Sequence, residues 1–415
     1  MKIIHLNHSD SQGGAARAAY RIHQALRSIG IDSVMWVNRS QTRNNSVYLS
    51  QSRWHGTFIR LRLALSKQLT KSLITGNPIL HSPALFPSKW PELINATDAN
   101  FVNLHWINFE MLSIEDVSRI NKPIVWTLHD MWAFCGAEHY TEDVRFQEGY
   151  SRGNRPTHES GFDLNRWTWS RKLRAWKRPL HIIAPSQWIA DCVKQSVLMH
   201  DWPVSVIPNA LNTNIWRPIE RNIALDLLGL PEVGPVLIFG AIGGGSDFRK
   251  GADLLFDALR HLRGEIPGLQ LLVFGENRPK ETPDVGFPIH YLGHLHDDLI
   301  LRIVYSAADA LVVPSRQDNL PTTAIEANAC GTPVVCFDTC GLPDIVNHQK
   351  NGWLAKAFDT EDLANGIRWV LKDTDRRKTL STQARSDAVK RFSYPVIAKA
   401  YQAVYEQVLN KSAKI

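Results

Sequence analysis

The stretch that decides the fold is VVPSRQDNLPTTAIEANACGTPVVCF, residues 312–337. An apolar run over 310–313 ends at a Pro-Ser pair, which predicts a buried strand followed by a turn. The polar turn, 316–321, leads into a predicted helix over 322–330 that a glycine ends. A second apolar run over 333–336 predicts another strand. Strand, helix and strand in this order indicate a parallel sheet in an α/β domain.

Two carboxylates and one helix start lie close together in this stretch. Asp318 falls in the turn and Glu326 in the helix, eight positions later. We expect both to face one crevice at the carboxyl end of the sheet, where open α/β sheets bind ligands. The N–H groups around Thr322 and Thr323 are free to bind an anion such as phosphate, because the first N–H groups of a helix have no partner inside it.

The stretch resembles the donor-binding signature of family 4 retaining glycosyltransferases, which contains two glutamates separated by seven residues. Asp318 stands where that family has its first Glu, and Glu326 is the second. The other matching residues are Asn319, Leu320, Pro321, Ala327, Gly331, Thr332, Pro333, Val334 and Val335. The resemblance implies the GT-B fold: two Rossmann-like domains with a deep interdomain cleft, and a C-terminal helix that crosses back to the N-terminal domain.

Shorter matches extend the resemblance over nearly the whole chain. They lie at residues 13–15, 128–130, 184–186, 207–209, 249–251 and 305–309. Within the family the chain looks most similar to the transferases of colanic acid and exopolysaccharide biosynthesis, on the TLHDMW segment at 127–132.

The pattern along the chain predicts two α/β domains. A length of 415 residues exceeds what one hydrophobic core usually serves. A polar, proline-containing segment follows residue 207 and marks the linker. We therefore predict an N-terminal acceptor-binding domain over 1–212, a nucleotide-sugar-binding domain over 213–392 and a terminal helix over 393–415. Strands are expected near 2–6, 33–37, 101–105, 124–128, 180–184, 205–207, 236–239, 269–274, 310–313 and 333–336.

Composition narrows the compartment and the partners. The net charge of +7 and the pI near 9.1 suit anionic substrates or an acidic membrane surface. No nucleic-acid-binding module is recognisable, so nucleic acid is not an expected partner. No apolar run approaches the roughly 20 residues that cross a bilayer, and the first residues lack a signal-peptide core. We expect a cytoplasmic protein. Its five scattered cysteines favour neither a disulfide framework nor a zinc site.

Transfer from a nucleotide-sugar requires cations that neutralise the leaving diphosphate. The resemblance implies that Lys250 binds the donor phosphates, and Arg249 can assist it. The family often places an Arg a few residues earlier, where this chain has Ala241. The glycines at 243–245 offer backbone N–H groups that can approach phosphate instead. The alternative for Arg249 and Lys250 is a solvated basic pair.

The resemblance also implies roles for the remaining site residues. Glu326 would bind the ribose hydroxyls of the donor, and Asp318 the hydroxyls of its sugar. His129, after a predicted strand, would contact the donor sugar at the reaction centre, with Asp130 orienting it or meeting the acceptor. Gly14, in the first loop, would approach the donor phosphate and the acceptor. Simpler alternatives are a structural role for His129, a plain turn at Gly14, and threonines at 322 and 323 that only cap a helix.

The predicted activity is that of a retaining hexosyltransferase that needs no metal or other cofactor. It would move a sugar from a nucleotide diphosphate to a glycan or lipid-linked oligosaccharide in surface polysaccharide biosynthesis. One alternative is another enzyme on the same fold, a nucleotide-sugar epimerase or a phosphorylase. The other is a noncatalytic GT-B protein that binds nucleotide or glycan as an assembly partner.

Two basic, aromatic segments carry a further prediction. Residues 53–74 combine apolar side chains at helical spacing with Arg and Lys, so they can lie on the inner face of an anionic membrane or receive a lipid-linked acceptor. Residues 166–178 hold three tryptophans among four cations. Both segments are equally compatible with amphipathic helices on the N-terminal sheet whose cations are solvated.

Overall fold

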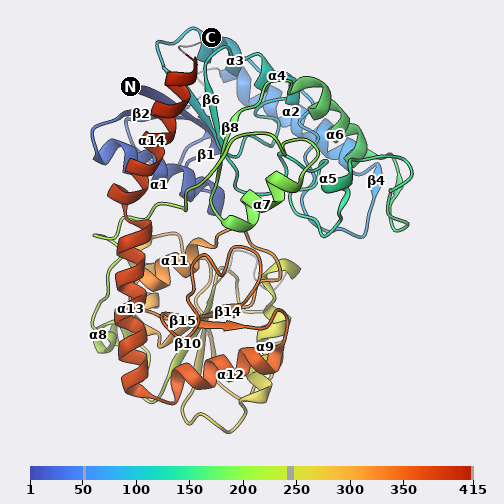
Figure 1. Cartoon of the computed structure of the whole chain (residues 1–415). Helices are drawn as coiled ribbons and strands as arrows, with labels where there is room; N and C mark the ends of the chain where they lie inside the picture. The colour runs from blue at the N-terminus through green and yellow to red at the C-terminus, as the bar shows by residue number, and fades with distance from the viewer. Residues whose placement is uncertain (50–52, 241–246, 413–415) are drawn as a thin grey trace. The chain divides into compact units, whose positions relative to one another are not determined.

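The structure is a computed structural model that describes residues 1–49, 53–240 and 247–412. Contacts within the chain divide it into two compact units (Figure 1). Unit 1 comprises Met1–Pro208 together with Ala398–Ile415, and unit 2 comprises Asn209–Ile397. Each unit contains its own parallel sheet.

Unit 1 has a seven-stranded parallel sheet in the order β3-β2-β1-β5-β6-β8-β9. Its strands are β1 (Lys2–Ser9), β2 (Asp32–Arg39), β3 (Val47–Leu49), β5 (Phe101–Leu104), β6 (Ile124–Thr127), β8 (His181–Ala184) and β9 (Val204–Val206). Every residue of β5, β6 and β8 is buried. Helices cover both faces of such a sheet, which is why these strands read as short continuous runs rather than as alternating patterns. A separate antiparallel pair joins β4 (Leu73–Ile74) to β7 (Ser160–Gly161).

The helices of unit 1 follow the strands in α/β order. They are α1 (Gly14–Ser28), α2 (Arg53–Thr70), α3 (Trp90–Asn95), α4 (Ile114–Ser118), α5 (Arg145–Glu148), α6 (Leu164–Ala175) and α7 (Gln187–Gln195). The side chain of Ser186 caps α7 by accepting a hydrogen bond from the backbone N–H of Ile189.

One alternative predicted that the cations of α6 are solvated. That alternative is wrong for two of them. The guanidinium of Arg171 binds the carboxylate of Glu115 and the backbone carbonyl of Pro83. The ammonium of Lys172 is fully buried and donates to three carbonyl oxygens in the 132–136 loop. Buried charges are tolerated only with such partners, so α6 holds that loop in place.

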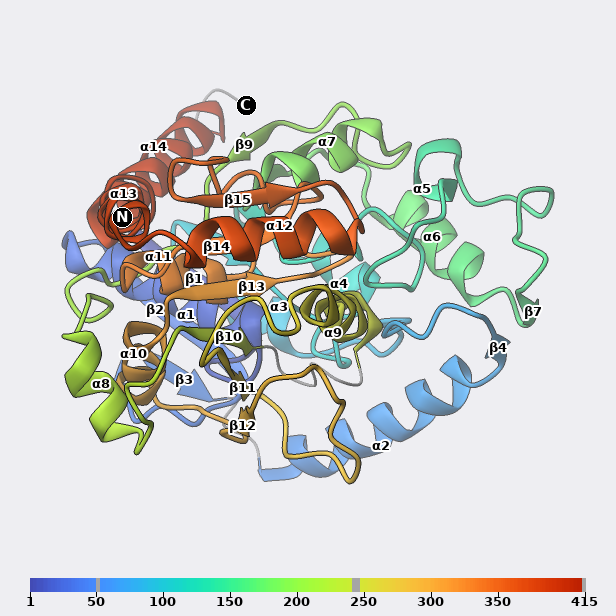
Figure 2. The ribbon, with the colours of Figure 1, turned by 90° about the horizontal axis from the view of Figure 1, so that it is seen from below.

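Unit 2 has a six-stranded parallel sheet, and Figure 2 shows its strands side by side in the order β12-β11-β10-β13-β14-β15. They are β10 (Val236–Gly240), β11 (Gln270–Phe274), β12 (Ile289–Tyr291), β13 (Ala310–Val313), β14 (Val334–Phe337) and β15 (Gly352–Ala355). The sequence prediction missed β12 and β15, the two edge strands, as well as β3 in unit 1.

Helices pack on both faces of the second sheet. They are α8 (Arg221–Leu227), α9 (Ala252–His261), α10 (Asp298–Ala307), α11 (Thr322–Ala329), α12 (Thr360–Leu371) and α13 (Thr374–Phe392), with a short 3-10 turn at Phe248–Lys250. Val236 and Ile238 of β10 belong to the core with α10 and α11, whereas Leu237 and Phe239 belong to the core with α9 and α12. Side chains of a strand alternate between its faces, so one apolar run supplies both layers.

The last helix, α14 (Tyr394–Ser412), returns the chain to unit 1. Tyr401 and Tyr405 are fully buried there. The Tyr405 hydroxyl shares a hydrogen bond of 2.9 Å with the amide of Asn103 on β5, and the Tyr401 hydroxyl lies 3.2 Å from that of Thr127 on β6. The predicted return of the C-terminal helix to the first domain is therefore confirmed.

Candidate functional site

The site in unit 2 is built where two loops meet at the carboxyl end of β13. Gly251 lies in the left-handed region with φ +68°, and a Cβ on it would stand 1.9 Å from the carbonyl oxygen of Pro314. Only glycine fits such a contact. The backbone N–H of Arg316 donates to the carbonyl of Arg249 at 2.7 Å. These contacts fix the basic loop before α9 against the loop that carries Asp318.

The close approach brings Lys250 and Asp318 together, although 68 positions separate them in the sequence. The Lys250 ammonium donates to the Asp318 carboxylate at 2.6 Å. Both side chains are mostly buried, with 22% and 11% of their surfaces exposed. The sequence prediction assigned Lys250 to phosphate and Asp318 to sugar. Their contact makes one small polar centre that can meet an anion and a hydroxyl at once.

The other predicted cation, Arg249, forms an ion pair with Asp247 at 2.6 Å. Arg316, which the sequence prediction did not consider, forks onto both oxygens of Asp253 and stacks on the Phe248 ring at 3.8 Å. Both arginines therefore stiffen the loop around Lys250. The predicted positions Ala241 and 243–245 lie outside the residues that the structure describes.

The helix start lies next to this centre, as the sequence predicted. Pro321 is the N-cap residue of α11 and forms no side-chain cap, and Thr322 and Thr323 are the first two helical residues. The alternative that these threonines cap the helix is therefore not supported. Both are half-buried, whereas the neighbouring Asn319 and Leu320 are almost fully buried and shape the turn.

Glu326 lies one turn further along α11 and is 2% exposed. One of its oxygens accepts a hydrogen bond of 3.0 Å from the hydroxyl of Tyr305. The backbone carbonyl of Tyr305 in turn accepts from the Thr332 hydroxyl at 2.6 Å. The carboxylate is thus oriented by Tyr305. This tyrosine lies in the matching stretch 305–309 of the sequence, but no role was predicted for it.

In unit 1, His129 follows β6 and ends a row of three imidazoles. A hydrogen bond of 3.0 Å joins His129 Nε2 to His105 Nδ1, and one of 2.8 Å joins His105 Nε2 to His5 Nδ1. The rings stack in pairs at 5.3 and 5.1 Å. Burial lowers the pKa of His129 to about 4 and the pKa values of His105 and His5 well below their usual range. All three rings are therefore neutral at pH 7.

One interpretation of the sequence was that Asp130 orients His129. The structure shows that it does not. Its carboxylate accepts from His139 Nδ1 at 2.6 Å and from the Trp106 indole at 2.8 Å. His139 Nε2 is bonded to the Ser82 hydroxyl at 2.8 Å. The sequence provided no basis for a prediction about His139, because this residue lies in a polar loop without a motif.

Gly14 opens α1 after Gly13, the N-cap residue, whose φ is +91°. A Cβ at either position would meet nothing within 4 Å, so neither glycine is required by packing. Open space beside a helix start leaves room for a ligand. Among the residues that the structure describes, no group of three or more His, Cys, Asp or Glu side chains could hold a metal ion. The absence of a metal requirement stays a prediction.

Two family models match parts of this chain. Residues 12–215 match the family model for Glycosyltransferase Family 4, and residues 244–387 match the model for Glycosyl transferases group 1. A D-inositol 3-phosphate glycosyltransferase from Xylanimonas cellulosilytica is 31% identical over 224 residues, which are 50% of this chain and 52% of the relative. The chain thus spans about half the length of the curated relatives it matches.

Solved structures resemble the whole chain. Sucrose-phosphate synthase from Thermosynechococcus elongatus superposes with a TM-score of 0.65 at 18% identity, covering 99% of this chain and all of that one. Anabaena Alr3699/HepE, solved in complex with UDP and glucose, has the same TM-score at 17% identity and covers 98% and 100%. These likenesses show the fold. Over the described residues, no helix combines the length and apolarity needed to cross a membrane.

Proposed function

Since this chain is a GT-B protein that joins a Glycosyltransferase Family 4 segment to a Glycosyl transferases group 1 segment, we propose that it is a retaining glycosyltransferase. It would transfer a hexosyl group from a nucleotide-diphosphate sugar to a glycan or lipid-linked acceptor in surface polysaccharide biosynthesis. The proposed catalytic residues are His129 and Asp318. The predicted likeness to colanic acid enzymes stays a prediction.

The observation that carries this proposal is the contact of Lys250 with Asp318 beside the uncapped start of α11. A diphosphate placed there would meet the Lys250 ammonium and the N–H groups of Thr322 and Thr323, which would stabilise its charge as the bond to the sugar breaks. The sugar hydroxyls would then replace Lys250 as partners of Asp318.

Glu326 would bind the two ribose hydroxyls, because vicinal hydroxyls suit one carboxylate held in a fixed orientation by Tyr305. A neutral His129 would contact the donor sugar. The leaving phosphate oxygen would take the proton of the acceptor hydroxyl, so the reaction needs no metal and no protein base of high pKa.

A donor panel tests the proposal. The full chain is incubated with UDP-, GDP- and ADP-sugars in the presence of EDTA, while bound nucleotide and released nucleoside diphosphate are measured. We expect one donor to bind saturably, with binding lost in Glu326→Ala and Lys250→Ala. Lys372→Ala is the matched control, since this lysine is exposed at the C-cap of α12 and pairs with Glu265. The anomeric configuration of the product, read by NMR, tests retention.

Three outcomes would change the conclusion. If no donor binds, the assignment of the donor site is wrong. If a donor binds but is never turned over with any acceptor, the noncatalytic alternative is favoured. Conversion of the free nucleotide-sugar without an acceptor would instead indicate an epimerase.

The proposal includes membrane contact through residues 53–74. It is supported by side chains of this segment that the structure describes. Leu61 and Leu65, one turn apart on α2, are 56% and 50% exposed. An exposed apolar stripe on a basic helix supports peripheral contact with an anionic leaflet.

A further inference from the structure

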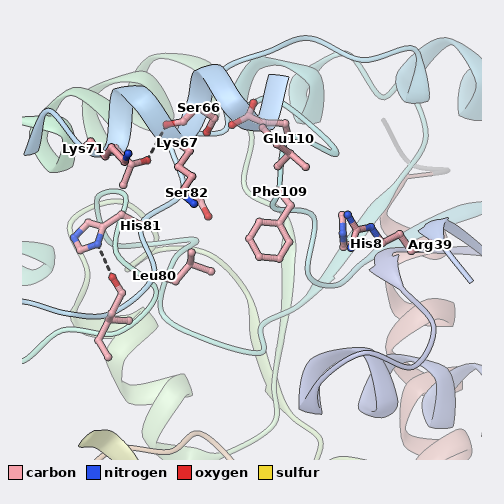
Figure 3. A pocket seen from close by; sticks show the side chains of 13 residues that line it. His8, Arg39, Ser66, Lys67, Lys71, Leu80, His81, Ser82, Phe109 and Glu110 are labelled. Carbon is pink, nitrogen blue, oxygen red and sulfur yellow. Dashed lines mark hydrogen bonds between the residues drawn. The ribbon is translucent and has the colours of Figure 1, made fainter. Parts of the chain in front are cut away.

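Unit 1 contains a pocket of about 670 Å³ beneath α2 (Figure 3), and none of the three imidazoles in the row lines it. Its size falls within the roughly 300–1,000 Å³ of small-molecule sites. The α2 residues that line it, 63, 66, 67 and 70, and Lys71 just after the helix form one stripe at helical spacing. The exposed Leu61 and Leu65 lie on the opposite side of the helix, at about 100° of rotation per residue. The pocket is therefore a feature separate from that exposed apolar stripe.

The pocket is apolar inside and basic at its mouth. Leu63, Ile79, Leu80 and Phe109 contribute most of the apolar wall. Lys67, Lys71 and Arg39 line it as well, and all three are exposed. No carboxylate partner for these cations occurs among the residues described. An anionic group is the complement of Lys67 and Lys71, which lie one turn apart at the end of α2, while Arg39 lies beside His8 on another side of the pocket.

The only carboxylate among the lining residues that the structure gives this pocket is already engaged. Glu110 is 2% exposed and accepts hydrogen bonds from the backbone N–H groups of Leu85 and Phe86 at 2.8 and 2.9 Å. It therefore does not neutralise the mouth. Phe109 and Glu110 both lie in the left-handed region, with φ of 54° and 55°. Two adjacent non-glycine residues held in this conformation are strained, and such strain gathers at ligand-binding sites.

Two buried imidazoles line the pocket with nitrogens that lack a partner in the described structure. They are His8 Nδ1 and His81 Nε2, on side chains of 6% and 8% exposure. A buried polar atom without a partner is costly, so these two positions are kept at some expense of stability. Figure 3 shows His81 beside Leu80 on one side of the pocket and His8 beside Arg39 on another.

The pocket is also linked to the end of β6. Ser82, in its wall, binds His139, which binds Asp130, the residue next to His129. A ligand in the pocket would thus lie against the network that fixes this loop.

We propose that this pocket binds the acceptor through an apolar chain that carries a phosphate or diphosphate group. The apolar chain would pack on Leu63, Ile79 and Phe109, and the phosphate would bind Lys67 and Lys71. Calling the ligand the acceptor rests on the transferase function proposed above.

Farnesyl phosphate is a suitable probe, with farnesol and inorganic phosphate as its two halves. Binding to the full chain is measured by calorimetry. We expect farnesyl phosphate to bind saturably and more tightly than either half, and to weaken as salt is raised. Lys67→Glu combined with Lys71→Glu should weaken it about tenfold, equivalent to about 1.4 kcal/mol. Arg60→Glu, an exposed cation of α2 outside the pocket, is the control for charge.

A second pair of variants tests the apolar wall. Leu63→Ser should weaken binding, whereas Leu61→Ser, on the opposite side of α2, should not. The reverse result would overturn the pocket and assign the contact to the outer face of the helix, as for a membrane surface. Equal binding of farnesyl phosphate by the wild type and the double lysine variant would also overturn the proposal.

Donor binding by the same variants separates the two proposals. If the donor is bound and turned over but the pocket variants bind farnesyl phosphate as tightly as the wild type, only the pocket assignment is wrong. If no nucleotide-sugar binds but the variants still have a lower affinity for farnesyl phosphate, the pocket assignment is supported and the proposed transferase function is wrong.

Discussion

Gly251→Ala tests the contact that assembles the site of unit 2. Two costs add at this position. An alanine at φ +68° costs about 1–2 kcal/mol, because its Cβ crowds the following carbonyl oxygen. The same Cβ would stand 1.9 Å from the carbonyl oxygen of Pro314, so the two loops must separate. Forcing extra volume into a packed site costs a further 1–3 kcal/mol or so.

Gly229→Ala is the matched control. Gly229 has φ +65°, but a Cβ on it would meet nothing within 4 Å, so only the conformational cost applies. Urea unfolding of both variants should place Gly251→Ala about 1–3 kcal/mol below Gly229→Ala in free energy of unfolding. Donor affinity should fall in Gly251→Ala alone, since separation of the loops pulls Lys250 from Asp318. Equal stability and equal donor affinity of the two variants would refute the reasoning.

Three further substitutions probe single interactions. Tyr305→Phe removes the hydroxyl that binds Glu326, and it should raise the KM for donor about three- to tenfold in steady-state kinetics, because one such hydrogen bond contributes about 1 kcal/mol; an unchanged KM would contradict the role of Glu326. Burial lowers the pKa of Lys172 to about 7, so between pH 7 and 9 the folded chain progressively loses a proton that the unfolded chain keeps. Wild-type stability should therefore gain up to about 1.4 kcal/mol per pH unit from this group, and urea unfolding of Lys172→Met should lack that gain; the window stops at pH 9 because burial also raises the pKa of the Cys135 thiol. Burial lowers the pKa of His129 to about 4, so its contribution to stability is lost as the pH falls from about 6.5 to 4, and acid unfolding followed by circular dichroism should be less steep in His129→Asn.

The sequence predicted the central strands and the donor loop because those features are local. The run at 310–313 and the turn before Thr322 each carry their own apolar pattern or helix-start signal, and the structure has β13 and α11 within one residue of the predicted bounds. The edge strands β12 and β15 were missed because they are only three and four residues long and are partly exposed.

Contacts across long separations were beyond the sequence. Nothing in the pattern shows that Lys250 reaches Asp318, because the turn of Gly251 against Pro314 depends on the register of two strands. The burial of Lys172 was missed for a related reason. Its three acceptors are backbone carbonyls, which every residue has, so they cannot be recognised from the residue types in the sequence.

The three imidazoles of unit 1 also set which nitrogen of His129 carries its hydrogen. A neutral ring has one N–H and one lone pair, so the two hydrogen bonds of the row must run in one direction. At the far end, His5 Nε2 is buried without a partner in the described structure. An orphaned lone pair there is better tolerated than an orphaned N–H, which favours hydrogens running from His5 towards His129. His129 Nε2 then accepts, and its hydrogen is on Nδ1. His129 would therefore meet a substrate as a hydrogen-bond donor, and a substitution at His5, two rings away, could reverse that polarity.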